Sequence, residues 1–143
     1  MAVPTGSGTE TLHSALFEDV ANSAVDLITG VQHHIYTVLS VTARCVGVDS
    51  STSNRTVYLY ITGYDSTAGA SAQTIYLANW QAVDGETFVW NDKISFFGYE
   101  PSSNTQSARA AQAGSTAQYL KMLTADADTK LDVTCTYIDQ DWS

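Results

Sequence analysis

The sequence predicts an all-β protein, an antiparallel β-sandwich of jelly-roll type with about eight or nine short strands. Three observations support this fold class. Short segments alternate apolar and polar residues, they are rich in β-branched and aromatic residues, and polar or glycine-containing turns separate them. A partial barrel is the alternative arrangement of the same strands.

Two predicted strands, TLHSALFE and AVDLITGV, come first in the chain. The stretch HSALFEDVANSAVDLI also has apolar residues at spacings that partly suit a helix, including Leu12, Leu16 and Val20. A helix is therefore the alternative for this stretch, and strands are the preferred interpretation.

Two longer strands follow. In IYTVLSVTARCVG, side-chain alternation places Ile35, Leu39, Val41, Ala43 and Cys45 on one face. In RTVYLYITGYD, one face carries Val57, Leu59 and Ile61, and the other carries Tyr58, Tyr60, Thr62 and Tyr64.

Five further segments complete the predicted sheets: QTIYLANWQ, ETFVWND, KISFFGYE, AQYLKML and KLDVTCTYIDQDW. Asp84-Gly85 predicts a hairpin, because glycine adopts positive φ without steric cost. Asn91-Asp92 predicts a second tight turn.

The 143 residues suit one domain, which buries roughly 68–70% of its unfolded surface. We expect a flexible N-terminal arm over residues 1–10 and a single β-sandwich domain over 11–143. Residues 101–117 have almost no large apolar side chain, which predicts a long mobile surface loop. A short helix over SARAAQAG is the alternative.

The charge balance excludes several classes of partner. The chain has 15 acidic and six basic residues, giving a net charge of −9. Without clustered cations, neither nucleic acid nor an anionic membrane is an expected partner. The first residues lack the pattern of a secretory signal, so we expect the protein to be made in a cytoplasm and left there.

The two cysteines, Cys45 and Cys135, lie in separate predicted strands. Neither has metal-ligand spacing, and reduced core thiols are the preferred interpretation. A disulfide between adjacent strands is the alternative.

Catalytic and metal-binding patterns are weak. The adjacent His33 and His34 would point to opposite faces of a strand, and no nucleophile elbow accompanies them. The segment DADTKLD resembles a calcium loop but lacks its glycine and terminal glutamate, so a charged turn is preferred. Asp139 and Asp141 suit a solvated tail better than an acid–base pair. We therefore expect no enzyme activity, no cofactor and no bound metal.

The tyrosines Tyr58, Tyr60 and Tyr64 share one face of a predicted strand. Aromatic side chains on an exposed face can stack on sugars or anchor a protein partner. Burial of this face beneath other parts of the protein is the alternative.

Three stretches together resemble small virion proteins of tailed bacteriophages, notably of marine and cyanobacterial phages. They are IYTVLSVTARCV with RTVYLYITGYD, then DGETFVWNDKISFFG, then KLDVTCTYIDQDWS, within about residues 30–143. Members of this family serve as head decoration (cement) proteins or as neck, tail or fibre parts. The shared motifs are structural and bring no catalytic residues with them.

The resemblance implies a non-enzymatic virion structural protein, foremost a capsid decoration protein that bridges capsomers. The expected partners are the major capsid protein or other virion proteins, with self-association as a dimer or trimer. Ile138 and Trp142, at the rim of the last strand, are candidate anchors for a neighbouring subunit, beside Tyr58, Tyr60 and Tyr64. A fibre-tip or carbohydrate-binding module and a neck or tail component are the alternatives.

Overall fold

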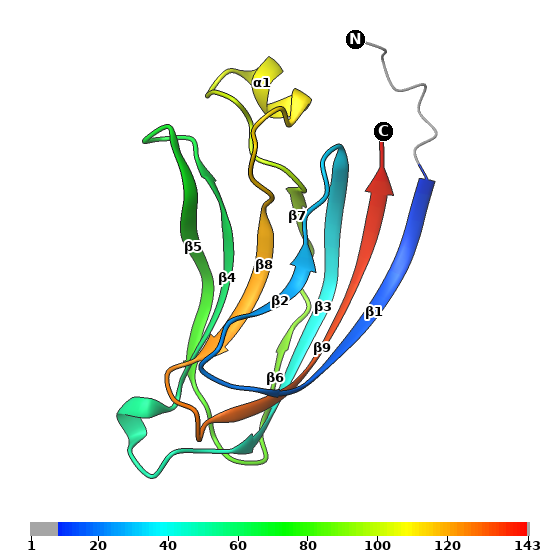
Figure 1. The fold of residues 1–143 in the computed structure, drawn as a ribbon. Coiled ribbons are helices and arrows are strands. Elements are labelled where there is room, and N and C mark those ends of the chain that lie inside the picture. The colour runs from blue at the N-terminus through cyan, green and yellow to red at the C-terminus, as the bar shows by residue number, and fades with distance from the viewer. Residues whose placement is uncertain (1–8, 143) are drawn as a thin grey trace.

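The computed structural model describes residues 9–142, which form two antiparallel sheets packed face to face (Figure 1). The first sheet contains β1 (Thr9–Val20), β3 (His34–Gly47), β6 (Thr87–Trp90), β7 (Ile94–Phe97) and β9 (Lys130–Asp141). The second contains β2 (Val25–Thr29), β4 (Thr56–Asp65), β5 (Ala70–Gln81) and β8 (Tyr119–Thr124). A 3₁₀ turn, η1 (Thr52–Asn54), and one helix, α1 (Gln106–Ala111), lie in connections.

The strand order confirms the predicted jelly roll. The first sheet has the order β1-β9-β3-β6, with β7 also paired to β3, and the second has β2-β8-β4-β5. Both β6 and β7 run antiparallel to β3, one after the other, as two halves of one strand. The chain therefore passes from one sheet to the other after each strand except at the β4–β5 hairpin of the second sheet and the β6–β7 interruption of the first, which is the double Greek key of a jelly roll.

Each segment expected to be a strand is one, including the N-terminal pair for which a helix was the alternative. The alternating burial along β9 explains the agreement: Leu131, Val133 and Cys135 are at most 1% exposed, and the residues between them face outward. Burying one such side chain contributes about 1.5–3 kcal/mol, so the pattern fixes which face points inward.

The predicted inner face of β3 is wrong in its first half. Val41, Ala43 and Cys45 are buried as expected, but Tyr36 and Val38 face the core in place of Ile35 and Leu39. The reason is a β-bulge, in which the pairing with β9 shifts between Val38 and Ser40 and leaves Leu39 as an extra residue. One extra residue reverses the alternation on either side of it.

Neither predicted tight turn forms a hairpin. The Asp84-Gly85 turn leads from β5 in one sheet to β6 in the other, with Gly85 at φ 82° and its N–H donating to the Cys45 carbonyl. Asn91-Asp92 interrupts the β6–β7 strand opposite the bulge of β3. Both segments form the local turn that their residues predict. Neither turn, however, joins two strands that pair with each other.

Residues 98–118 cross the end of the sandwich and carry α1, the short helix noted above as the alternative (Figure 1). Thr105 caps α1 by accepting from the Ala108 N–H. The buried Gln112 fastens this segment to the β2–β3 turn, since its Oε1 accepts from the backbone N–H groups of His33 and Tyr99. Gln118 Oε1 accepts from the Tyr64 N–H.

The backbones come very close at this end. A Cβ built on Gly98 would lie 2.0 Å from the Val31 carbonyl oxygen, and one on Gly30 would lie 2.0 Å from the Gly98 oxygen. Glycine at both positions lets the two segments form backbone hydrogen bonds, among them Gly98 N–H to the His34 carbonyl at 2.9 Å.

Residues 1–8 of the predicted arm lie outside the described residues, and Thr9 and Glu10 begin β1. Within residues 9–142, no helix has the length and hydrophobicity needed to span a membrane.

Both cysteines are free and buried. On the inner face of the first sheet, Cys45 lies opposite Leu131 and Cys135 opposite Val41. The two thiols are thus separated by four residues along β9, about 13 Å, which is beyond disulfide reach. Burial raises the pKa of the Cys135 thiol to about 12.

Candidate interaction surfaces

The outer face of the first sheet carries a broad surface without charge in its middle. Its outward residues fall into rows across the paired strands, and none of those between the two ends of the sheet is ionisable. We call them the uncharged face: Leu12, Ile138, Thr37 and Ser95; Ser14, Thr136 and Ser40; Leu16, Thr134, Thr42 and Val89.

Four of the hydroxyl groups on the uncharged face form hydrogen bonds in pairs. The Thr42 and Thr134 hydroxyls form a hydrogen bond, and Thr37 and Ser95 form another at 3.1 Å. When a partner covers these groups, the hydrogen bonds between them remain. This lowers the free-energy cost of removing water from the surface.

Charges lie at the two ends of this face and at its border, where the exposed Asp92 and Lys93 lie between β6 and β7 opposite the bulge of β3. Glu10 stands at one end, where its carboxylate accepts from Gln140 Nε2 at 2.6 Å. Arg44 and Asp132 are paired positions at the other end, near Glu18. There a shallow hollow of about 560 Å³ opens between them, bordered also by Leu16.

The outer face of the second sheet carries the tyrosine face, Tyr58, Tyr60 and Tyr76. The Tyr76 ring centroid lies 5.5 Å from that of Tyr58 and 5.7 Å from that of Tyr60. Tyr76 is 57% exposed and covers Tyr60, which is only 8% exposed. The sequence analysis did not select Tyr76, although QTIYLANWQ is a predicted strand and Tyr76 is its tyrosine.

The structure does not bring the five predicted interface residues together. Tyr58, Tyr60 and Tyr64 belong to β4 in the second sheet, whereas Ile138 lies on the uncharged face of the first. Trp142 follows β9 at the rim, where its backbone N–H donates to the His33 carbonyl at 2.9 Å. Its indole Nε1 is buried without a hydrogen-bond partner among the described residues.

A polar cluster lies at the same rim. The His34 ring is 2.7 Å from Asp139 through Nδ1 and 3.5 Å from Asp141 through Nε2. His13 stacks on Tyr137 and its Nε2 lies 4.0 Å from Asp139. The sequence predicted a solvated turn and tail here, because nothing local indicates that β1, β3 and β9 meet side by side.

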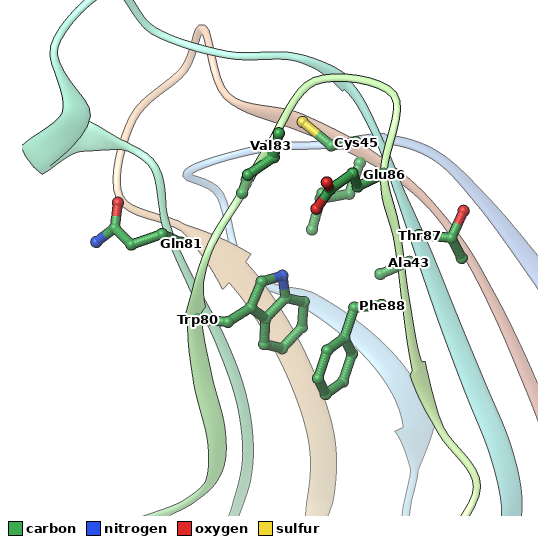
Figure 2. Close-up of a pocket in the computed structure, with 10 residues that line it drawn as sticks. Ala43, Cys45, Trp80, Gln81, Val83, Glu86, Thr87 and Phe88 are labelled. Atoms are coloured by element: carbon green, nitrogen blue, oxygen red, sulfur yellow. The ribbon is translucent and has the colours of Figure 1, made fainter.

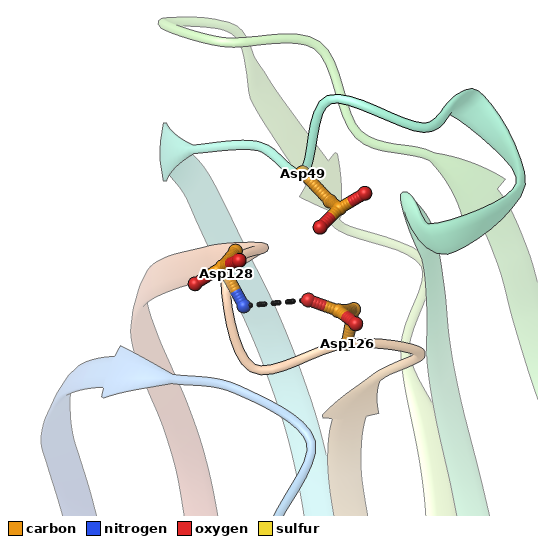
Figure 3. Close-up of side chains that lie close together, drawn as sticks. All are labelled: Asp49, Asp126 and Asp128. Atoms are coloured by element: carbon orange, nitrogen blue, oxygen red, sulfur yellow. Dashed lines mark hydrogen bonds between the residues drawn. The ribbon is translucent and has the colours of Figure 1, made fainter.

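Three carboxylates converge at the opposite end of the sandwich (Figure 3). Asp49 lies between β3 and η1, while Asp126 and Asp128 lie between β8 and β9; one oxygen of each falls within 4.8 Å of the others. Carboxylates at this spacing are ligands that Ca²⁺ accepts. Asp132, the third acid of the calcium-like segment, lies on β9 instead. The Ser51 N–H lowers the pKa of Asp49 by donating to its carboxylate.

A cleft of about 130 Å³ opens between the sheets beside the β5–β6 turn. Figure 2 shows the Trp80 and Phe88 rings side by side in it, with Cys45 near the turn. The rings stack with centroids 3.8 Å apart, so they close the middle of the cleft.

No model of a known protein family matches the sequence, and no curated protein matches it. Solved structures match at low identity. One is a chain of the disulfide-linked pili of Bacillus endospore appendages, with 14% identity over 100% of this chain and 97% of that one, and a TM-score of 0.43.

Two others come from viruses. A chain of the T13 particle of IBDV has 10% identity over 95% of this chain and 32% of that one, with a TM-score of 0.49. A chain of the naturally occurring empty particles of cowpea mosaic virus has 10% identity over 94% of this chain and 85% of that one, with a TM-score of 0.41. Likeness at this level carries no argument about what the present chain does.

Proposed function

We propose that the chain is a non-enzymatic structural protein of a phage virion, foremost a capsid decoration or cement protein. It binds the major capsid protein or other virion proteins, associates with itself and stabilises the head by bridging capsomers. The observation that carries the proposal is the uncharged face, in a chain whose net charge is −9.

The composition of this face suits a protein partner. The centres of protein–protein interfaces are depleted in charged residues, and their polar groups are hydrogen bonded. The uncharged face resembles such a centre, since its rows contain no charged residue and four of its hydroxyls form two hydrogen bonds. Nucleic acid would require clustered cations, and Arg44 is paired across the strands with Asp132.

Rigidity also supports a structural role. A cement protein acts by burying surface across a junction between subunits, so a sheet whose strands are held by hydrogen bonds loses little entropy on binding. Ile138, one of the predicted anchors, lies near one end of this face beside Leu12. Trp142, the other predicted anchor from the same strand, follows β9 close to that end.

The test is co-expression with the major capsid protein encoded by the same genome. Shells are sedimented and the bound chain is quantified. We expect saturable binding of the wild type. Thr136→Glu, and independently Val89→Glu, should weaken it at least about tenfold, because each buries an unpaired charge.

Thr74→Glu on the second sheet is the matched control and should bind as the wild type does. Thermal unfolding checks that each variant is folded. A wild type that does not sediment with shells, or face variants that bind as tightly as the wild type, would contradict the proposal.

The tyrosine face supports the alternative, a fibre-tip or carbohydrate-binding module. An exposed Tyr76 above two further rings is suited to stacking on a sugar. A glycan array with the wild type, Tyr58→Ala and Tyr76→Ala tests it. Binding lost in both variants would favour this function, and no binding by the wild type would remove it.

A further inference from the structure

The outer edge of β1 is an unpaired strand edge. Among residues 9–142, β1 pairs with β9 alone and so ends the first sheet, and in Figure 1 it is the outermost strand of that sheet. Edge strands are usually protected by lysine, proline, inward-pointing charge or a bulge. Residues 11–17 contain none of these, and the bulge of β1 comes only between Phe17 and Val20.

The same strand exposes two large apolar side chains. Leu12 is 68% and Leu16 is 77% exposed, the highest values among the large hydrophobic residues described. They lie on one face, with Ser14 between them. Such a pair next to an open edge is an unfavourable surface in an isolated domain.

A second copy of this chain matches this edge in one register. If two β1 strands pair antiparallel about Ser14, Leu12 of each copy lies opposite Leu16 of the other, and Ser14 lies opposite Ser14. A two-fold interface requires such self-complementarity, in which each residue's partner has the reciprocal contact. Cross-strand pairs of large apolar residues stabilise sheets.

Charge sets the strength of this pairing. The paired stretch from Thr11 to Phe17 has no carboxylate or ammonium group. At its ends, however, Glu10 of one copy lies opposite Glu18 of the other. Like charges at these positions oppose association, and salt screens them.

We propose that the protein forms a two-fold dimer by antiparallel pairing of β1 with β1 of a second copy, giving one continuous sheet. This names the surface of self-association within the proposed function, but it rests on β1 alone. The four leucines form two cross-strand pairs, one on each side of the Ser14 pair, where the uncharged faces of the two copies join. Association tightens as ionic strength rises.

The experiment is analytical ultracentrifugation of the purified full chain over a range of concentration and salt. We expect a monomer–dimer equilibrium whose dissociation constant falls as salt rises. Glu18→Gln removes both like-charge pairs and should lower the dissociation constant about 3–10-fold at low salt. Ser14→Lys places two cations at the centre and should give a monomer.

Val89→Lys is the matched control, because it adds the same charge at the opposite side of the same sheet face and should still dimerise. The register is tested by Ser14→Cys, which should form a disulfide-linked dimer on mild oxidation, whereas Ser95→Cys should not. Cys45 and Cys135 are buried and do not compete.

A wild type that stays monomeric at every salt concentration overturns the proposal. So does a trimer, or a dimer that survives Ser14→Lys and fails to cross-link through Ser14→Cys. These outcomes leave the capsid-binding assay independent, since a monomer can still sediment with shells. Conversely, a β1 dimer that ignores shells would refute the proposed function and keep this inference.

Discussion

Trp80 of β5 stacks on Phe88 of β6 with 3.8 Å between ring centroids and 12° between ring planes, and this contact joins the two sheets at their open side. The strands that carry the rings belong to different sheets, and the chain between them is the Asp84-Gly85 turn. β5 and β6 belong to different sheets and do not pair through their backbones. The ring stack therefore supplies a contact between the sheets at this edge.

Phe88→Ala should lower the free energy of unfolding by about 2–3 kcal/mol, because it removes a partly buried ring and its stacking contact with Trp80. It should also speed labelling of Cys45, which lines the same cleft. Urea denaturation and thiol labelling with peptide mapping measure the two effects. Val89→Ala, on the neighbouring outward residue, is the control and should change neither. Unchanged Cys45 labelling in Phe88→Ala would show that the stack does not guard the cleft.

Alkaline pH should weaken the core through Tyr36 and Cys135. Burial raises both pKa values to about 12, and the Asp139 carboxylate adds to the effect on Tyr36. Their ordinary pKa values are 10.0 and 9.0, so the fold favours the neutral forms. This stabilisation is complete below about pH 9 and is lost as the pH rises through about 12.

Tyrosinate absorbance during a pH titration measures this directly. The wild type should show a last ionisation near pH 12 that coincides with unfolding. Tyr36→Phe should lack that component. Tyr76→Phe, which removes the hydroxyl of an exposed ring, is the control and should keep that component. Full ionisation of all tyrosines below about pH 11 in a folded wild type would refute the expected burial of Tyr36.

Sequence periodicity predicted each strand, because alternation with period two directly reflects which side chains the sandwich buries. It failed at Leu39, where one unpaired residue in β3 reverses the inward face. A bulge leaves no local trace here, since Ile35, Leu39, Tyr36 and Val38 are all apolar or aromatic. The register is decided by β9, almost 100 residues later in the chain.

The candidate surfaces were less predictable than the strands. Ile138 and the tyrosine rings are visible in the sequence, but the uncharged face combines residues from five strands. Its existence depends on the order β1-β9-β3-β6, which alternation within single strands does not encode. The same is true of the carboxylate trio, in which Asp49 joins Asp126 and Asp128 from a distant part of the sequence, whereas Asp132 of the calcium-like segment lies on β9.

The carboxylates of Asp49, Asp126 and Asp128 should repel one another, and Asp128→Asn should therefore raise the thermal midpoint at low ionic strength. The gain should disappear at high salt, because exposed charges are screened. Differential scanning calorimetry at two salt concentrations measures it. A lower midpoint for Asp128→Asn would mean that its carboxylate supports the loop.

Asp49→Ala is the companion variant and should lower the midpoint, since Ser51 N–H and Asn54 Nδ2 lose their acceptor. The pKa of Asp49 lies below its usual 3.8. The contribution of its carboxylate is therefore present above about pH 4 and is lost as the pH falls through the lower value. In Asp49→Ala this acid-dependent loss should be absent.

Glu100 fastens the start of β5 to the segment that carries α1. Its carboxylate is 2% exposed and accepts from the Ser71 hydroxyl and, at 2.7 Å, from the Ala72 N–H. Glu100→Ala leaves both donors unsatisfied and should cost about 2–3 kcal/mol of unfolding free energy. Ala72 has φ 54°, a conformation that disfavours a side chain, so Ala72→Gly should be neutral or stabilising by up to about 1 kcal/mol. Urea denaturation separates the two variants, and amide exchange at residue 72 should accelerate in Glu100→Ala alone. Equal exchange rates in both would mean that the backbone, and not Glu100, orders this turn.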